Sequence, residues 1–272
     1  MKIFDCFIYF DEDLLLDLRL NTLNDFVDKF IIVEADTTHT GKFKELKFDI
    51  NRFKKFKNKI NYYPIKNIKI DKNLKIKKNW SKHHLIDQSI RNSIANYIDE
   101  ASDNDWILIS DIDELPNPNE LINFDKNKKF GFFEQEMFYY KFNLKNFSDL
   151  AWYGSRICVK KYLKSPQWLR NIKVKTDKSF LKKIFNNQYI LKNGGWHFTY
   201  IKQPKEIITK IKSFAHSELV KEHMLNEKYI KNKIENFKDI FDREIVLKKV
   251  DLNEKFPEYL LKNKEKYSKF II

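Results

Sequence analysis

Residues 106–116 read WILISDIDELP, and this stretch decides the fold that the rest of the sequence predicts. The apolar run 106–109 is typical of a short strand buried on both faces of a parallel sheet. Asp111 and Asp113 follow it directly. In open α/β sheets, ligands bind in the crevice at the carboxyl ends of the strands. The sequence therefore places two carboxylates where such a sheet carries out its chemistry.

Asp111 and Asp113 offer hard oxygen ligands two positions apart. Such a pair suits Mg²⁺ or Mn²⁺, which keeps its other coordination positions for water and diphosphate oxygens. A solvated acidic turn after a core strand fits the same spacing, so the spacing alone does not separate the two interpretations. The Asp-x-Asp-x-Thr pattern of phosphatases fits less well, because Leu115 stands where that pattern has Thr or Val.

The first half of the chain alternates predicted strands and helices. Strands are expected at 3–10, 30–33 and 60–65, an apolar helix stripe at Leu16, Leu20, Leu23 and Val27, and a second helix at about 81–98. This alternation predicts an α/β fold with a mostly parallel central sheet of nucleotide-binding, Rossmann-like type.

The second half is less regular. Strands are expected at 130–140, from Trp152, and after a glycine turn at 193–195, and amphipathic helices from Pro204 to about 216 and around 230–241. Because no linker or repeat interrupts the chain, we expect one domain over 1–272.

Composition limits the classes of partner. The formal charge of +14 comes mainly from lysine, which ordinarily coats a solvated surface but also attracts nucleotide diphosphates and anionic membranes. Zinc-finger spacing, RNP-like motifs and Arg-rich segments are all lacking, so we expect no nucleic-acid partner. Without a signal-peptide layout or an apolar run of 18 residues, the sequence predicts a cytoplasmic protein.

Several patches, taken in order, resemble the glycosyltransferases of family 17, whose named animal member adds the bisecting N-acetylglucosamine of N-glycans. The patches are DCFIYF (5–10), FIIVE (30–34), TGK (40–42), QSIR (88–91), ISDIDELP (109–116), GWHF (195–198) and KSFAHSE (212–218). The resemblance implies a GT-A fold, a divalent metal, and inverting transfer from a nucleotide-sugar such as UDP-GlcNAc to a glycan acceptor. It also implies a donor-binding half over about 1–125 and an acceptor half over about 126–272.

Further donor-site candidates follow from their positions. Glu34 and Asp36 end a predicted strand where a carboxylate can accept hydrogen bonds from uracil or ribose, or simply cap a turn. Arg91 shares a helix face with His84 and Asp87, so it either reaches the nucleotide and the acidic strand end or forms a surface ion pair. Lys42 is a weaker candidate for phosphate.

His197 is the candidate third metal ligand beside Asp111 and Asp113, because the preceding glycines let the backbone approach a ligand closely. A hydrogen-bonded core histidine is the alternative. Trp196 is either a stacking surface for a sugar or an ordinary buried aromatic residue.

An inverting transferase needs a group that takes the proton of the acceptor hydroxyl. Glu218 and His216 rank first because they follow a predicted helix within a matched patch, where capping that helix is the other interpretation. Glu134 and Glu136 are also eligible.

Two other functions stay open. A nucleotidyltransferase would need a Gly-rich basic loop after the first strand, where residues 11–20 hold acids and leucines instead. A non-enzymatic basic adaptor for anionic surfaces would use the charge of +14 alone.

Overall fold

The computed structural model describes residues 1–70, 74, 83–125, 127–148, 151–174, 188–213 and 219–272. Its strands are β1 (Ile3–Ile8), β2 (Lys29–Ala35), β3 (Ile60–Ile65), β4 (Trp106–Asp111), β5 (Glu114–Pro116), β6 (Phe130–Tyr139), β7 (Leu144–Asn146), β8 (Arg156–Val159), β9 (Gln188–Thr199) and β10 (Leu247–Lys249). Its α-helices are α1 (Asp13–Leu23), α2 (His83–Ser93), α3 (Pro118–Ile122), α4 (Pro166–Asn171), α6 (Pro204–Ser213), α7 (Glu227–Glu235) and α8 (Glu258–Lys262). Short 3₁₀ helices are η1 (Ile50–Phe56), η2 (Ile94–Tyr97), η3 (Lys160–Tyr162), η5 (Glu222–Leu225) and η6 (Ser268–Phe270).

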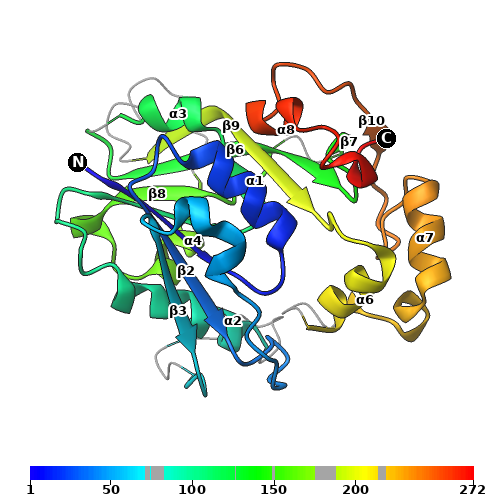
Figure 1. Cartoon of the computed structure of the whole chain (residues 1–272), viewed down its shortest axis with the longest axis horizontal. Coiled ribbons are helices and arrows are strands. Elements are labelled where there is room, and N and C mark those ends of the chain that lie inside the picture. Colours follow the sequence, from blue (N-terminus) through cyan, green and yellow to red (C-terminus); the bar gives the residue numbers. More distant parts are fainter. Residues whose placement is uncertain (71–73, 75–82, 126, 149–150, 175–187, 214–218) are drawn as a thin grey trace.

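The described strands form one sheet in the order β10-β7-β6-β8-β4-β1-β2-β3, with β9 beside β6 and β5 beside β9 (Figure 1). Strands β4, β1, β2 and β3 are parallel neighbours. This parallel block is the part that the apolar runs predicted, and β3 has the predicted bounds. The mixed α/β class is thus confirmed.

The expectation of a mostly parallel sheet is wrong. β8 runs antiparallel to both β4 and β6, and the β6–β7, β7–β10 and β5–β9 pairs are antiparallel as well. Among the described strands of the second half, only β6 and β9 pair in parallel. Hydrophobic periodicity reports which face of a strand is buried and carries no information about the direction of its neighbour.

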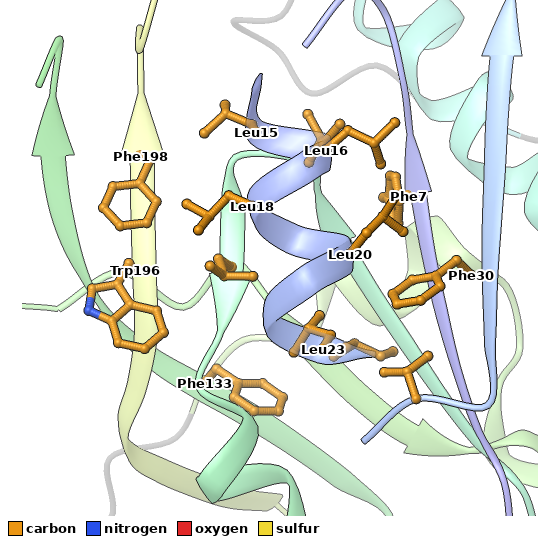
Figure 2. Packing of buried hydrophobic residues seen from close by; sticks show 14 of the residues in the cluster. Phe7, Leu15, Leu16, Leu18, Leu20, Leu23, Phe30, Phe133, Trp196 and Phe198 are labelled. Atoms are coloured by element: carbon orange, nitrogen blue, oxygen red, sulfur yellow. The ribbon is translucent and has the colours of Figure 1, made fainter. Parts of the chain in front are cut away.

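Helices cover both faces of the parallel block. Side chains of α1 pack with Phe7 and Phe30 on one face, as Figure 2 shows, while Ile90 of α2 and Leu169 of α4 pack with Ile107 on the other. Alternating residues of β1 and β4 therefore enter different cores, and this burial on two sides explains the unbroken apolar run at 106–109.

Several element bounds differ from the predictions. The strand expected from Trp152 begins at Arg156, and Gly194 and Gly195 lie inside β9 instead of forming a turn before it. Gly195 has φ +128, and a Cβ atom there would collide with the Leu115 carbonyl of the paired strand. The close β5–β9 pairing, and not a turn, therefore requires glycine.

The helix predicted to start at Ser81 begins at His83 among the described residues, and η2 continues it. In the C-terminal half, α6 ends at Ser213 where its description stops, and α7 ends at Glu235 before the Phe237 and Phe241 positions assigned to it. Within the described part of the chain, no helix is long and apolar enough to cross a membrane.

Candidate active site

The turn after β4 is built around Asp111, whose side chain is 39% exposed. One carboxylate oxygen, Oδ1, accepts a hydrogen bond from Arg91 Nη2 at 2.9 Å, and the other, Oδ2, accepts one from Arg170 Nη2 at 2.9 Å. Two guanidinium groups from different helices therefore converge on the strand end that the sequence singled out.

Arg91 reaches this position from α2, as predicted. Its guanidinium also forms a bidentate pair with Asp87 one helical turn earlier, at 2.9 and 3.0 Å, and donates to Gln167 Oε1 at 2.6 Å. Bidentate pairing fixes the plane of a guanidinium group. Because Asp87 holds one edge of Arg91, its other edge is directed at Asp111.

Arg170 arrives from α4, a short helix capped by the Ser165 hydroxyl. The guanidinium of Arg170 contacts both carboxylate oxygens of Glu114, at 2.6 and 3.0 Å. Glu114 is fully buried and also accepts from the Trp152 indole at 2.8 Å and from the Asp111 amide at 2.8 Å. Glu114 is thus a buried anchor that joins Arg170 and Trp152 to the turn.

Asp113 lies on the opposite flank of the turn and is 7% exposed. Its Oδ2 accepts from Lys210 Nζ of α6 at 2.9 Å, and its Oδ1 lies 3.7 Å from His197 Nε2 of β9. The β5–β9 pairing brings His197 here, since Glu114 and His197 are direct partners in the sheet.

These cations keep both aspartates ionised. Burial alone would raise the pKa of Asp111, but Arg170 and Arg91 outweigh it and hold that pKa well below its usual value. Burial opposes ionisation of Asp113 in the same way, and Lys210 together with His197 lowers its pKa. The site therefore brings together three cationic groups, those of Arg91, Arg170 and Lys210, and four carboxylates, those of Asp87, Asp111, Asp113 and Glu114.

A second ion pair supports the turn from the α1 side. Arg19 and Asp5 are both fully buried and pair through two hydrogen bonds, at 2.6 and 2.7 Å. Arg19 also donates to the Glu114 carbonyl at 2.9 Å and the Asp111 carbonyl at 3.3 Å. The backbone of the turn is thus tied to the centre of the sheet.

The predicted uridine-side carboxylates differ from each other. Glu34 is fully buried, and its two oxygens accept from Lys44 Nζ, the Lys47 and Phe48 amides and the Tyr62 hydroxyl. Every donor belongs to the protein, so in this structure Glu34 secures the segment after β2.

Asp36 is only partly buried, and it accepts hydrogen bonds from the Asn67 amide at 3.1 Å and the Thr37 hydroxyl at 2.9 Å. Of the two carboxylates, Asp36 is therefore the one that a ligand can reach. The Lys42 side chain is exposed, and its amide closes a hairpin by donating to the Thr38 hydroxyl at 3.1 Å.

Trp196 points away from the aspartates. It is 6% exposed, its ring lies parallel to Phe198, and its indole donates to the Lys255 carbonyl at 3.2 Å. Both rings belong to the same hydrophobic cluster as the leucines of α1 (Figure 2). Successive strand residues face opposite ways, so placing His197 at the site places Trp196 in the core instead of beside a sugar.

The candidate catalytic bases Glu218 and His216 lie outside the described residues, so their assignment stays a prediction. The other eligible carboxylates are placed. Glu134 accepts from the Tyr153 hydroxyl at 2.8 Å and from Lys192 at 2.5 Å, while Glu136 is paired with Lys145.

Sequence reasoning missed Arg170 and Lys210. Ser165 followed by Pro166 was an available signal for a helix start, because Pro is favoured at the first helical position after a Ser cap. Lys210 carried no comparable signal, since it is one of three lysines on an amphipathic helix. Its proximity to Asp113 depends on the path of the chain from β9 to α6.

Asp113 and His197 are close enough that the pair could hold a divalent ion. Two ligand atoms 3.7 Å apart can share one ion about 2.0–2.1 Å from each. Nε2 is the His197 nitrogen that lies 3.7 Å from Asp113 Oδ1, while Nδ1 is buried and has no hydrogen-bond partner among the described residues. No group of three or more His, Cys, Asp or Glu side chains in the described ranges is placed to hold a metal, so water and phosphate would complete the shell.

Comparison with known proteins identifies the family. The family model described as glycosyltransferase family 17 matches residues 1–272, the whole chain. The chain belongs to glycosyltransferase family 17. As a glycosyltransferase it uses a sugar donor and an acceptor, which favours glycosyl transfer over the nucleotidyltransferase and adaptor alternatives. No curated protein matches the chain significantly.

Proposed function

We propose that this glycosyltransferase moves N-acetylglucosamine from UDP-GlcNAc to a hydroxyl of a glycan, with inversion and with a divalent ion, Mn²⁺ or Mg²⁺. The observation that carries the proposal is the convergence of Arg91, Arg170 and Lys210 on Asp111 and Asp113. A diphosphate leaving group needs cationic groups around it as its bond to the sugar breaks, and these residues place three such groups at one strand end, where a bound divalent ion would add further positive charge.

The carboxylates and cations have separate roles in this proposal. Asp113 and His197, with Asp111 nearby, would hold the ion, which when bound supplies Lewis-acid neutralisation of the diphosphate. Arg170 and Lys210 already lie against these carboxylates, so both can donate to phosphate oxygens as the donor binds. Asp36 is the proposed acceptor of hydrogen bonds from the uridine.

Inversion requires the acceptor hydroxyl to attack the sugar from the face opposite the diphosphate, while a base takes its proton. We assign that base to Glu218 or His216. Peripheral contact with anionic membranes remains a proposal that rests on the net charge of +14.

The test uses Asp113→Asn, which keeps the shape of the side chain and removes its charge. We expect release of UDP from UDP-GlcNAc, measured with Mn²⁺ and no acceptor, to fall by about 100-fold or more. Calorimetric binding of UDP should lose its dependence on Mn²⁺. Asp251→Asn, at an exposed position, is the matched control. Full activity in Asp113→Asn would contradict the proposal.

A further inference from the structure

Trp152 lies beside the candidate site with 38% of its surface exposed. Its indole Nε1 donates to Glu114 at 2.8 Å, and its ring packs on His197, with centroids 5.0 Å apart and planes inclined by 30°. One edge of the indole is therefore fixed by the buried anchor and part of one face by His197, while the rest of the ring remains accessible.

The local backbone is fitted to this indole. A Cβ atom at Gly154 would collide with the Glu114 carboxylate and with the indole nitrogen of Trp152. The main chain of Trp152 exchanges two hydrogen bonds with Gln135 of β6, at 2.8 and 2.9 Å. With the backbone held in this way, the hydrogen bond to Glu114 and the packing on His197 keep the ring in one orientation, which lowers the entropy cost of using it as a binding surface.

Because Trp152 lies beside His197 and the proposed diphosphate site, its position determines which part of a bound nucleotide-sugar its ring can contact. In a nucleotide-sugar the sugar is bonded to the second phosphate, so it lies next to whatever holds the diphosphate. The faces of an indole carry partial negative charge, and the C–H groups on one face of a pyranose carry partial positive charge. The two surfaces therefore stack favourably.

We propose that Trp152 is the stacking platform for the sugar ring of the donor, in the position that Trp196 cannot occupy. This inference rests on the proposed function, because it assumes that the diphosphate lies at Asp113 and His197. It assigns recognition of the sugar and of the diphosphate to different residues, and the two can be measured separately.

The experiment compares the dissociation constants of UDP and UDP-GlcNAc, measured by calorimetry with Mn²⁺. The UDP constant divided by the UDP-GlcNAc constant reports what the sugar contributes to binding. In Trp152→Ala we expect this ratio to fall by about three- to tenfold, with the UDP constant nearly unchanged. Trp152→Phe keeps a ring and should keep most of the ratio. Tyr162→Ala, at 37% exposure beyond the opposite end of β4, is the control and should change neither constant.

A purely structural role for Trp152 predicts a different result. Trp152→Phe also loses the hydrogen bond to Glu114, so weakened binding of UDP itself in both variants would overturn the platform. An unchanged ratio in Trp152→Ala would overturn it as well. If the unmodified protein binds neither ligand, the proposed function fails, and that outcome is distinct from a protein that binds UDP but gains nothing from the sugar.

Discussion

Two ion-pair clusters meet at the turn 111–114, and they differ in exposure. Arg19 and Asp5 are fully buried, whereas Asp111 in the cluster with Arg91 and Arg170 is 39% exposed. The hydrogen bonds of Arg19 in the first cluster all go to other protein groups, so none of them is open to a ligand. The second leaves the Asp111 carboxylate at the surface between the guanidinium groups of Arg91 and Arg170. The same chemistry therefore stabilises the fold in one place and is open to a ligand in the other.

The largest effect on stability is expected at the buried pair. Arg19→Met leaves the Asp5 carboxylate buried without its partner, which should lower the free energy of unfolding by about 3–5 kcal/mol. Urea denaturation measures this change. Lys262→Met removes an exposed pair with Glu258 and should cost less than about 1 kcal/mol. The double variant Asp5→Leu with Arg19→Met should recover part of the loss. Equal losses in Arg19→Met and Lys262→Met would contradict the large stabilising role assigned to the buried pair.

Arg170 pairs with both the buried Glu114 and the exposed Asp111, so its substitution should affect both the stability of the fold and the binding of a ligand. Arg170→Met deprives the buried Glu114 of its cation, and because Trp152 and the Asp111 amide still donate to that carboxylate, we expect a loss of about 1–3 kcal/mol. Binding of UDP should also weaken, by about tenfold. Arg52→Met, at a half-exposed ion pair with Asp13, is the control for both measurements. A stability loss with no change in UDP affinity would show that Arg170 stabilises the fold and does not bind the ligand.

The smallest effect on stability is expected at Lys210. The side chain of its partner Asp113 is only 10% exposed, and His197 stays beside that carboxylate, so Lys210→Met should lower the free energy of unfolding by about 1–2 kcal/mol. The affinity for UDP-GlcNAc should also fall, by about three- to tenfold, since a phosphate contact is lost. Lys205→Met on the exposed part of the same helix is the matched control. An unchanged affinity for UDP-GlcNAc would show that Lys210 does not contact the ligand.

The sequence predicted the site best where local pattern and position coincide. Asp111 ends the apolar strand β4 and Asp113 follows it, Arg91 sits on the expected helix face, and His197 lies on the strand paired with β5. The structure brings these four residues together. Glu34 shows the limit of this reasoning, because a carboxylate at a strand end looks the same in sequence whether ligands or neighbouring amides satisfy it.

The fold was predictable to a similar extent. The parallel block followed from apolar runs such as 60–65, since strands buried on both faces need them. The antiparallel half did not follow, because β8 takes its direction from its contacts with β4 and β6.

By itself, the sequence determined the parallel core, the two aspartates at its edge and the membership of the family, because short-range hydrophobic periodicity and ordered motifs are properties of the chain alone. Only the tertiary structure decided that Arg170 and Lys210 complete the charge at the site, that Trp196 is buried and that Trp152 is exposed beside it. These features depend on contacts between residues far apart in the chain, and which of two alternating faces meets a ligand is set when the strands pair.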